Sequence, residues 1–124
     1  KCKMIVMEDL AEQNIYSAYP ELSKNQPEEE YRRLGEVMTN RDVEIEGVET
    51  YSHFKNRVVG CFSKITNEDY QTVAIITHGG PIRCIFRDIL KMGEFKKIGN
   101  GAIIELEKNN FDFTIAKIDG ATLQ

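Results

Sequence analysis

The amino-acid sequence predicts an α/β fold, with a mixed sheet and helices on both of its faces. Short apolar runs rich in Ile and Val, which are typical of buried strands, alternate with longer segments whose apolar residues recur at helical spacing. Residues 72–77 place four consecutive apolar residues between polar flanks, which indicates a strand covered on both faces. Strands separated by helices favour a sheet that lies between helix layers.

Length and composition limit the classes of protein to which the chain can belong. Its 124 residues suit a single domain, expected to span residues 1–124, and 41% hydrophobic with 29% charged residues is ordinary for a soluble protein. The apolar runs are too short for a membrane span, which needs about 18 residues, or for a signal peptide, so we expect a cytoplasmic protein with no membrane partner. A net charge of −4 without a Lys/Arg cluster argues against nucleic acid as a partner.

The N-terminal half predicts one strand and two helices. Residues 2–8 form a short apolar run that predicts a buried strand. Residues 26–38 predict a helix, because Pro27 suits its first turn and the glutamates that follow place negative charge at the positive end of the helix dipole. Residues 49–65 predict a second, amphipathic helix, with one face in the core made of Tyr51, Phe54, Val58, Cys61, Phe62 and Ile65.

The C-terminal half predicts a helix and a hairpin. Residues 81–90 return to helical spacing after the strand expected at 72–77. Residues 101–107 and 113–118 read as two strands, and the Asn and Asp residues between them favour a turn, which predicts a terminal hairpin. The cysteines form no C-x-x-C pair, so we expect thiols rather than disulfides or a zinc site, two of them on buried helix faces; they are Cys2, Cys61 and Cys84.

His78, Gly79 and Gly80 follow directly after the strand expected at 72–77. In parallel α/β units the ligand crevice lies beyond the carboxyl ends of the strands, and glycines let the backbone approach a ligand closely. A helix that begins near Pro81 would present unpaired N–H groups, and His78 could donate to a phosphate or carboxylate oxygen. The alternative is that the glycines only form a tight turn beside a partly exposed histidine.

Several segments together resemble the histidine phosphatase superfamily, the phosphoglycerate-mutase-like enzymes. ITHGGPIRCIFRDIL at 76–90 is similar to the family's second-histidine motif, and LAEQNIY at 10–16 is similar to its L-x-E-x-x-x-G segment. GVETYSHFKNRV at 47–58 is similar to the G-x-E-S/T segment, with an arginine eight residues after the Glu, and IGNGAIIELE at 98–107 resembles the approach to the penultimate strand. The resemblance implies a three-layer sandwich with a mostly parallel sheet, of which this chain is the C-terminal portion.

The resemblance implies a phosphate site built from four residues. His78 corresponds to the second histidine, which donates to a non-bridging phosphoryl oxygen, and Glu12 to the proton donor for the leaving oxygen. That role suits a carboxyl group whose pKa is raised by burial and by a neighbouring phosphate. Gly79 and Gly80 would offer backbone N–H groups. The implied partner is a small phosphate ester, and neither a metal nor another cofactor is implied.

Four further residues near these motifs have structural interpretations. Glu49 is expected to stabilise the dipole of the helix that follows it. Arg57 and Arg83 could reach a substrate, but solvated helix faces or structural salt bridges explain them more simply. His53 lies on a helix with no motif around it and is expected at the surface.

Departures from the family pattern shape the expected function. Tyr16 stands where the family usually has Gly, and residues 1–124 contain neither the R-H-G motif of the nucleophilic histidine nor the arginine that the family places in the helix after its second strand region. We therefore expect the fold to be incomplete at its N-terminus, by about 60 residues for typical βα spacing. The strand at 72–77 would then have an unpaired edge, which invites pairing with the missing N-terminal segment or formation of a homodimer.

The expected activity is that of a phosphoric monoester hydrolase, a histidine phosphatase that acts through a phosphohistidine intermediate. The intact protein would be active, whereas this chain alone, without the nucleophile, would be inactive. HGGPIR at 78–83 resembles the small broad-specificity phosphatases more than the mutases. Two alternatives stay open: a non-catalytic phosphate-binding or interaction module, and a plain α/β domain whose T-H-G-G turn is only structural.

Overall fold

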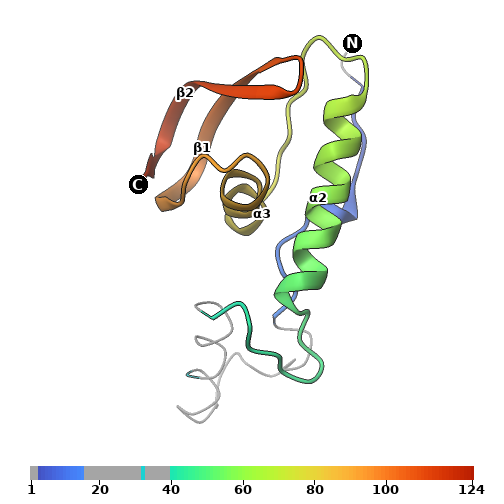
Figure 1. Cartoon of the computed structure of the whole chain (residues 1–124), viewed down its shortest axis with the longest axis vertical. Helices are drawn as coiled ribbons and strands as arrows, with labels where there is room; N and C mark the ends of the chain where they lie inside the picture. Colours follow the sequence, from blue (N-terminus) through green and yellow to red (C-terminus); the bar gives the residue numbers. More distant parts are fainter. Residues whose placement is uncertain (1–2, 16–31, 33–39) are drawn as a thin grey trace. The chain divides into compact units, whose positions relative to one another are not determined.

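The computed structural model describes residues 3–15, 32 and 40–124, and the chain divides into two compact units, 1–81 and 82–124. The helix expected at 26–38 lies outside the described residues, apart from Arg32. No helix in the described ranges is both long and apolar enough to cross a membrane. The elements in chain order (Figure 1) are η1 (Glu8–Leu10), α2 (Tyr51–Asn67), α3 (Gly79–Cys84), η2 (Ile85–Ile89), β1 (Phe95–Asn109) and β2 (Asp112–Leu123).

The first unit is built on the 17-residue helix α2, which confirms the amphipathic helix expected at 49–65. Thr50 is its N-cap, and the Thr50 hydroxyl oxygen accepts a hydrogen bond from the His53 N–H at 3.2 Å. Apolar side chains spaced by three and four residues form one buried face, made of Phe54, Val58, Cys61, Phe62 and Ile65. Tyr51, expected on the same face, is only partly buried.

The N-terminal segment covers this buried face. The short 3₁₀ turn η1 packs against α2, and it buries Leu10, while Ile15 and Val48 complete the same core. The Cys61 thiol lies 3.3 Å from the Met7 sulfur, and burial raises the pKa of Cys61. Both described cysteines, Cys61 and Cys84, are buried thiols, as expected.

Two strands expected from apolar runs are not strands in the structure. Residues 3–7 and 72–78 follow irregular paths, and they expose apolar side chains such as Met4, Val73 and Ile76, the last at 97%. A strand exists only where a neighbour completes its hydrogen bonds, and among the described residues the only paired strands are β1 and β2. The described residues therefore form helices and one two-stranded antiparallel sheet, not a three-layer sandwich with a mostly parallel sheet.

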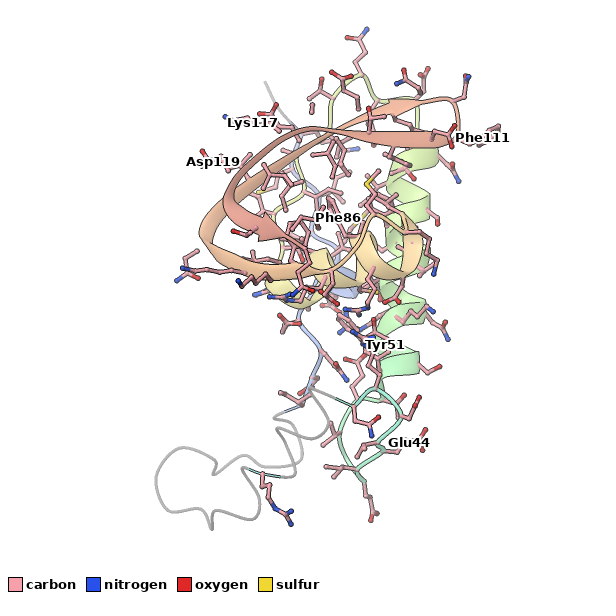
Figure 2. The ribbon with its side chains drawn as sticks, turned by 60° about the vertical axis from the view of Figure 1, so that its left-hand side comes forward. Glu44, Tyr51, Phe86, Phe111, Lys117 and Asp119 are labelled. Atoms are coloured by element: carbon pink, nitrogen blue, oxygen red, sulfur yellow. The ribbon has the colours of Figure 1, made fainter. Side chains whose placement is uncertain are left out.

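The second unit begins with helical residues and ends in a hairpin. The helix expected at 81–90 is present, since α3 continues into the π-helical turn η2. The Leu90 N–H closes this turn by donating to the Ile85 carbonyl at 2.8 Å. Phe86 and Phe95 meet edge to face, with ring centroids 4.8 Å apart, and both are buried together with Cys84 and Ile85. Figure 2 shows Phe86 on the helical segment of this unit.

The hairpin expected from residues 101–118 is confirmed, although its strands are longer than expected. Strand β1 pairs antiparallel with β2, from Asn109 opposite Asp112 at the turn to Phe95 opposite Leu123 at the open end. Asn110 takes a positive φ of 58° in the turn, and Phe111 at the tip is 94% exposed (Figure 2). Register shifts between Ile98 and Ile103 interrupt the ladder, which explains why the sequence pattern marks only part of each strand.

Ion pairs join the helical residues of the second unit to Glu94, the residue before β1. Arg83 Nη1 lies 3.2 Å from Glu94 Oε1, and the same guanidinium donates to the Phe95 carbonyl. Arg87 bonds the other oxygen of Glu94. Partial burial acts to raise the pKa of Glu94, but hydrogen bonds and attraction from Arg87 and Arg83 outweigh burial and lower it. Arg83 is thus in a structural salt bridge, which was one of its two simpler interpretations.

Candidate active site

The segment around Glu12 at residues 9–15, called here the acid segment, and the T-H-G-G turn at residues 77–80 meet within the first unit. The Gly80 backbone N–H donates to Glu12 Oε2 at 2.9 Å, across 68 positions of sequence. The Thr77 hydroxyl donates to the Leu10 carbonyl, which is a second bond between the same two segments. The structure therefore brings Glu12 together with Gly80, which the resemblance had placed in one site.

Gly80 allows this approach because it has no side chain. A Cβ at Gly80 would lie 1.8 Å from Glu12 Oε1, far closer than two non-bonded atoms can approach, whereas a Cβ at Gly79 would meet nothing within 4 Å. The Glu12 carboxylate also accepts the Gln13 N–H at 3.0 Å through Oε1. The two neighbouring glycines are therefore not equivalent, and only Gly80 makes room for the carboxylate.

His78 immediately precedes the first residue of α3 and is exposed. Helix α3 begins at Gly79, so the expectation that a helix starts close to Gly80 is correct. The expectation that His78 ends a buried strand is wrong, because residues 72–77 have no strand partner among the described residues. The phosphate-binding roles of His78, Gly79 and Gly80 and the acid role of Glu12 stay predictions.

Glu49 and Arg57 form a two-pronged ion pair beside the acid segment. Arg57 Nε donates to Glu49 Oε1 at 2.7 Å, and Arg57 Nη2 donates to Glu49 Oε2 at 2.8 Å. The Asn14 N–H donates to Glu49 Oε2 at 2.9 Å, and His53 Nδ1 lies 2.8 Å from Oε1. The carboxylate is thus bound by three neighbours and does more than act on a helix dipole.

These contacts shift the pKa values of both partners. The hydrogen bond from Arg57 lowers the pKa of Glu49 to about 2, against the opposing effect of burial and with help from Asn14 and His53. The hydrogen bond from Glu49 in turn raises the pKa of Arg57. Arg57 is therefore in a structural salt bridge, which was one of its two simpler interpretations, and the pair is fully ionised at neutral pH. The sequence signal for it was the arginine eight residues after Glu49, in the segment at 47–58.

An open hollow of about 490 Å³ lies beside the acid segment. Its lining includes Glu12, Glu49 and Arg57, and it excludes His78; the complete lining is Glu8, Ala11, Glu12, Asn14, Gly47, Val48, Glu49, His53 and Arg57. His53 has a side chain that is 74% exposed, so its expected surface position is confirmed, although its contact with Glu49 was not foreseen. In the described part of the chain, no group of three or more His, Cys, Asp or Glu side chains is arranged to hold a metal ion.

Comparison with known proteins gives the family. The family model for the histidine phosphatase superfamily (branch 1) matches residues 1–119 of the 124-residue chain. Searches of the curated proteins and of the solved structures found no match. The family implies a phosphoglycerate-mutase-like α/β fold and the binding of phosphate-ester substrates. The match spans the acid segment, the Glu49–Arg57 pair and the T-H-G-G turn, and the chain therefore belongs to branch 1 of the histidine phosphatase superfamily.

Proposed function

We propose that the chain supplies the second histidine and the acid of a phosphoric monoester hydrolase that works through a phosphohistidine intermediate. His78 is the second histidine and Glu12 is the acid, while the nucleophile comes from an R-H-G segment that residues 1–124 do not contain. The single observation that carries the proposal is the hydrogen bond of 2.9 Å from the Gly80 N–H to the Glu12 carboxylate. It supports the proposal because it joins an acid to a turn whose N–H groups suit an anion.

In the proposed site, the turn holds the phosphoryl group. His78 donates to one non-bridging oxygen, and the N–H groups of Gly79 and Gly80 donate to others, so the negative charge is bound without a metal ion. In this structure the Gly80 N–H donates a hydrogen bond to the Glu12 carboxylate. In the proposed complex the same N–H donates to a phosphate oxygen instead. This exchange releases the Glu12 carboxyl group toward the oxygen of the leaving alcohol.

The proposed reaction has two in-line steps. The nucleophilic histidine nitrogen forms a bond to phosphorus while the bond from phosphorus to the leaving oxygen breaks, and Glu12 gives that oxygen its proton. Water then attacks the phosphohistidine, Glu12 takes a proton from the water, and the bond from phosphorus to nitrogen breaks to release phosphate. His78 keeps its hydrogen bond to the phosphoryl oxygens through both steps.

The second candidate is a non-catalytic phosphate-binding or interaction module. The observation that favours it is the absence of an R-H-G motif from residues 1–124, whose two histidines are His53 and His78. His53 lies on α2 and contacts Glu49. No glycine follows it directly in the sequence, as Gly79 follows His78, so it does not replace the missing nucleophile. Neither candidate predicts turnover by the 124-residue chain alone, so the test must include a longer protein.

The test is hydrolysis of an aryl phosphate by the 124-residue chain and by a version extended at its amino terminus with an R-H-G segment, each with and without His78→Ala. We expect only the extended version to turn over, and we expect His78→Ala to lower that turnover by about 100-fold or more. An inert extended version would favour the non-catalytic module. Turnover by the short chain that depends on His78 would make His78 itself the nucleophile.

A further inference from the structure

We infer that Arg57 is a positioning residue for the acid. It holds the backbone of the segment that carries Glu12 against α2, and it thereby sets where the Glu12 carboxylate lies. The functional part of this inference rests on the proposed acid role of Glu12. The positioning itself rests only on contacts within the first unit, so it can be tested without turnover.

The guanidinium of Arg57 uses all five of its N–H donors. Nε and one hydrogen of Nη2 go to the two oxygens of Glu49, at 2.7 and 2.8 Å. Nη1 donates to the Asp9 carbonyl at 2.8 Å and to the Ala11 carbonyl at 2.9 Å. The second hydrogen of Nη2 goes to the Glu12 carbonyl at 3.0 Å. In this arrangement Arg57 has no donor left for a substrate, so it acts on the reaction indirectly, through the residues that it holds.

Arg57 is itself held rigidly, which a positioning residue requires. Only 15% of its side chain is exposed, and only 11% of the Glu49 side chain. The guanidinium carbon lies over the ring of Phe54, 5.0 Å from its centre, and Phe54 belongs to the buried face of α2. Arg57 is itself a residue of α2. Its planar guanidinium group therefore presents a fixed set of donors to three carbonyl groups of the acid segment.

The acid segment needs such an external partner. Beyond the three residues of η1, Ala11 and Glu12 have no regular secondary structure to bind their carbonyl groups. Arg57 satisfies both carbonyls from one side, while the Gly80 N–H binds the Glu12 carboxylate from the other. Glu12 is thus anchored through its backbone by α2 and through its side chain by the T-H-G-G turn.

Loss of the backbone anchor should move the carboxylate. When a catalytic group is displaced by about 1 Å, the rate of the reaction can fall on the order of 100-fold. A lysine at position 57 would keep the positive charge, but an ammonium group has three donors and no planar fork, so it cannot bind Glu49 in two-pronged fashion and three carbonyls as well. Arg57→Lys therefore separates charge from geometry.

The first experiment measures amide hydrogen exchange in the 124-residue chain. Gly80 is the second residue of α3, where N–H groups have no partner within the helix, so its protection reports the bond to Glu12. We expect Arg57→Ala and Arg57→Lys to speed exchange of the Gly80 N–H about tenfold, while the amides of Val58 and Phe62 inside α2 stay protected. Arg41→Ala is the control, because Arg41 lies over the Tyr51 ring and should leave Gly80 unchanged.

Two outcomes of this experiment would overturn the inference. One is unchanged exchange at Gly80 in both Arg57 variants. The other is equal acceleration at Gly80, Val58 and Phe62, because it would show a general loss of structure rather than movement of the acid. If Arg57→Ala does not fold, Arg57→Lys decides the matter, since it retains the charge and most of the aliphatic stem.

The second experiment uses the extended, active version and two substrates. An alkyl phosphate needs a proton on its leaving oxygen, whereas an aryl phosphate with a stable phenolate leaving group does not. We expect Arg57→Lys to lower kcat for the alkyl phosphate about tenfold or more and for the aryl phosphate less than about threefold, and we expect Glu12→Gln to show the same difference between the substrates. Equal losses on both substrates would reject positioning of the acid. An inert extended version would instead reject the proposed function and leave the exchange result standing.

Discussion

The carboxylate of Glu12 accepts the backbone N–H of Gly80 at 2.9 Å, across 68 residues of chain. The contact joins the acid segment to the T-H-G-G turn, and a Cβ at position 80 would displace the Glu12 carboxylate from its present place. It places the acid at the first turn of α3, where helix N–H groups attract negative charge. A bound phosphate would compete with Glu12 for the same donor.

Gly80→Ala should displace the acid, whereas Gly79→Ala should not. A Cβ at Gly80 would lie 1.8 Å from Glu12 Oε1, and a Cβ at Gly79 would meet nothing within 4 Å. In the extended version we expect Gly80→Ala to lower turnover of an alkyl phosphate by about tenfold or more, and Gly79→Ala by less. Steady-state kinetics on the two variants checks this, and equal effects would contradict it.

Thr77→Val should loosen the link between the acid segment and the turn. The Thr77 hydroxyl donates to the Leu10 carbonyl, and valine keeps the shape of the side chain while it removes the donor. We expect a loss of about 1 kcal/mol in the free energy of unfolding, measured by urea denaturation. Thr77→Ser is the matched control, because it retains the hydroxyl group. A serine variant as unstable as the valine variant would show that the hydrogen bond is not the cause.

Glu49 should make the stability of the first unit depend on pH. Its pKa falls from 4.5 to about 2, chiefly through the hydrogen bond from Arg57. Because the folded pKa lies below the unfolded one, the stabilisation is complete above about pH 5 and is lost as the pH falls toward 2. The shift corresponds to at most about 3 kcal/mol. The side chain is only 11% exposed, so solvent screens the pair weakly.

The measurement is urea unfolding between pH 7 and pH 3. Glu49→Gln should remove much of the pH dependence in this window, because glutamine does not titrate. The control is Glu44→Gln, since Glu44 is an exposed residue of the segment that precedes α2 in the same unit (Figure 2). The prediction fails if the two variants show the same pH dependence as the wild type.

Thr50→Ala should destabilise α2 through loss of its N-cap. The Thr50 hydroxyl oxygen accepts the His53 N–H at 3.2 Å, and removal of such a cap costs about 1 kcal/mol. Thermal unfolding followed by circular dichroism measures the change, and Thr50→Ser should recover most of it. A Thr50→Ala variant as stable as the wild type would show that the cap contributes nothing here.

Local sequence pattern determined the elements whose contacts are local. The buried face of α2 could be predicted because residues three and four apart share one side of a helix, as Phe54, Val58 and Cys61 do. The hairpin could be predicted because its two strands are neighbours in sequence and its turn carries Asn110. The segments that carry Glu12 and Gly80 were recognised from motifs, and the structure brings them into contact.

Only the tertiary structure decided the elements that depend on distant partners. Residues 72–77 have the composition of a buried strand, yet they form no strand and Ile76 is 97% exposed. A strand needs a neighbouring chain segment to pair with, and the described residues do not provide one. Arg57 could be placed on a helix by its spacing. Its five hydrogen bonds depend on where the carbonyl groups of Asp9, Ala11 and Glu12 lie, and no sequence pattern specifies the positions of backbone oxygens in an irregular segment.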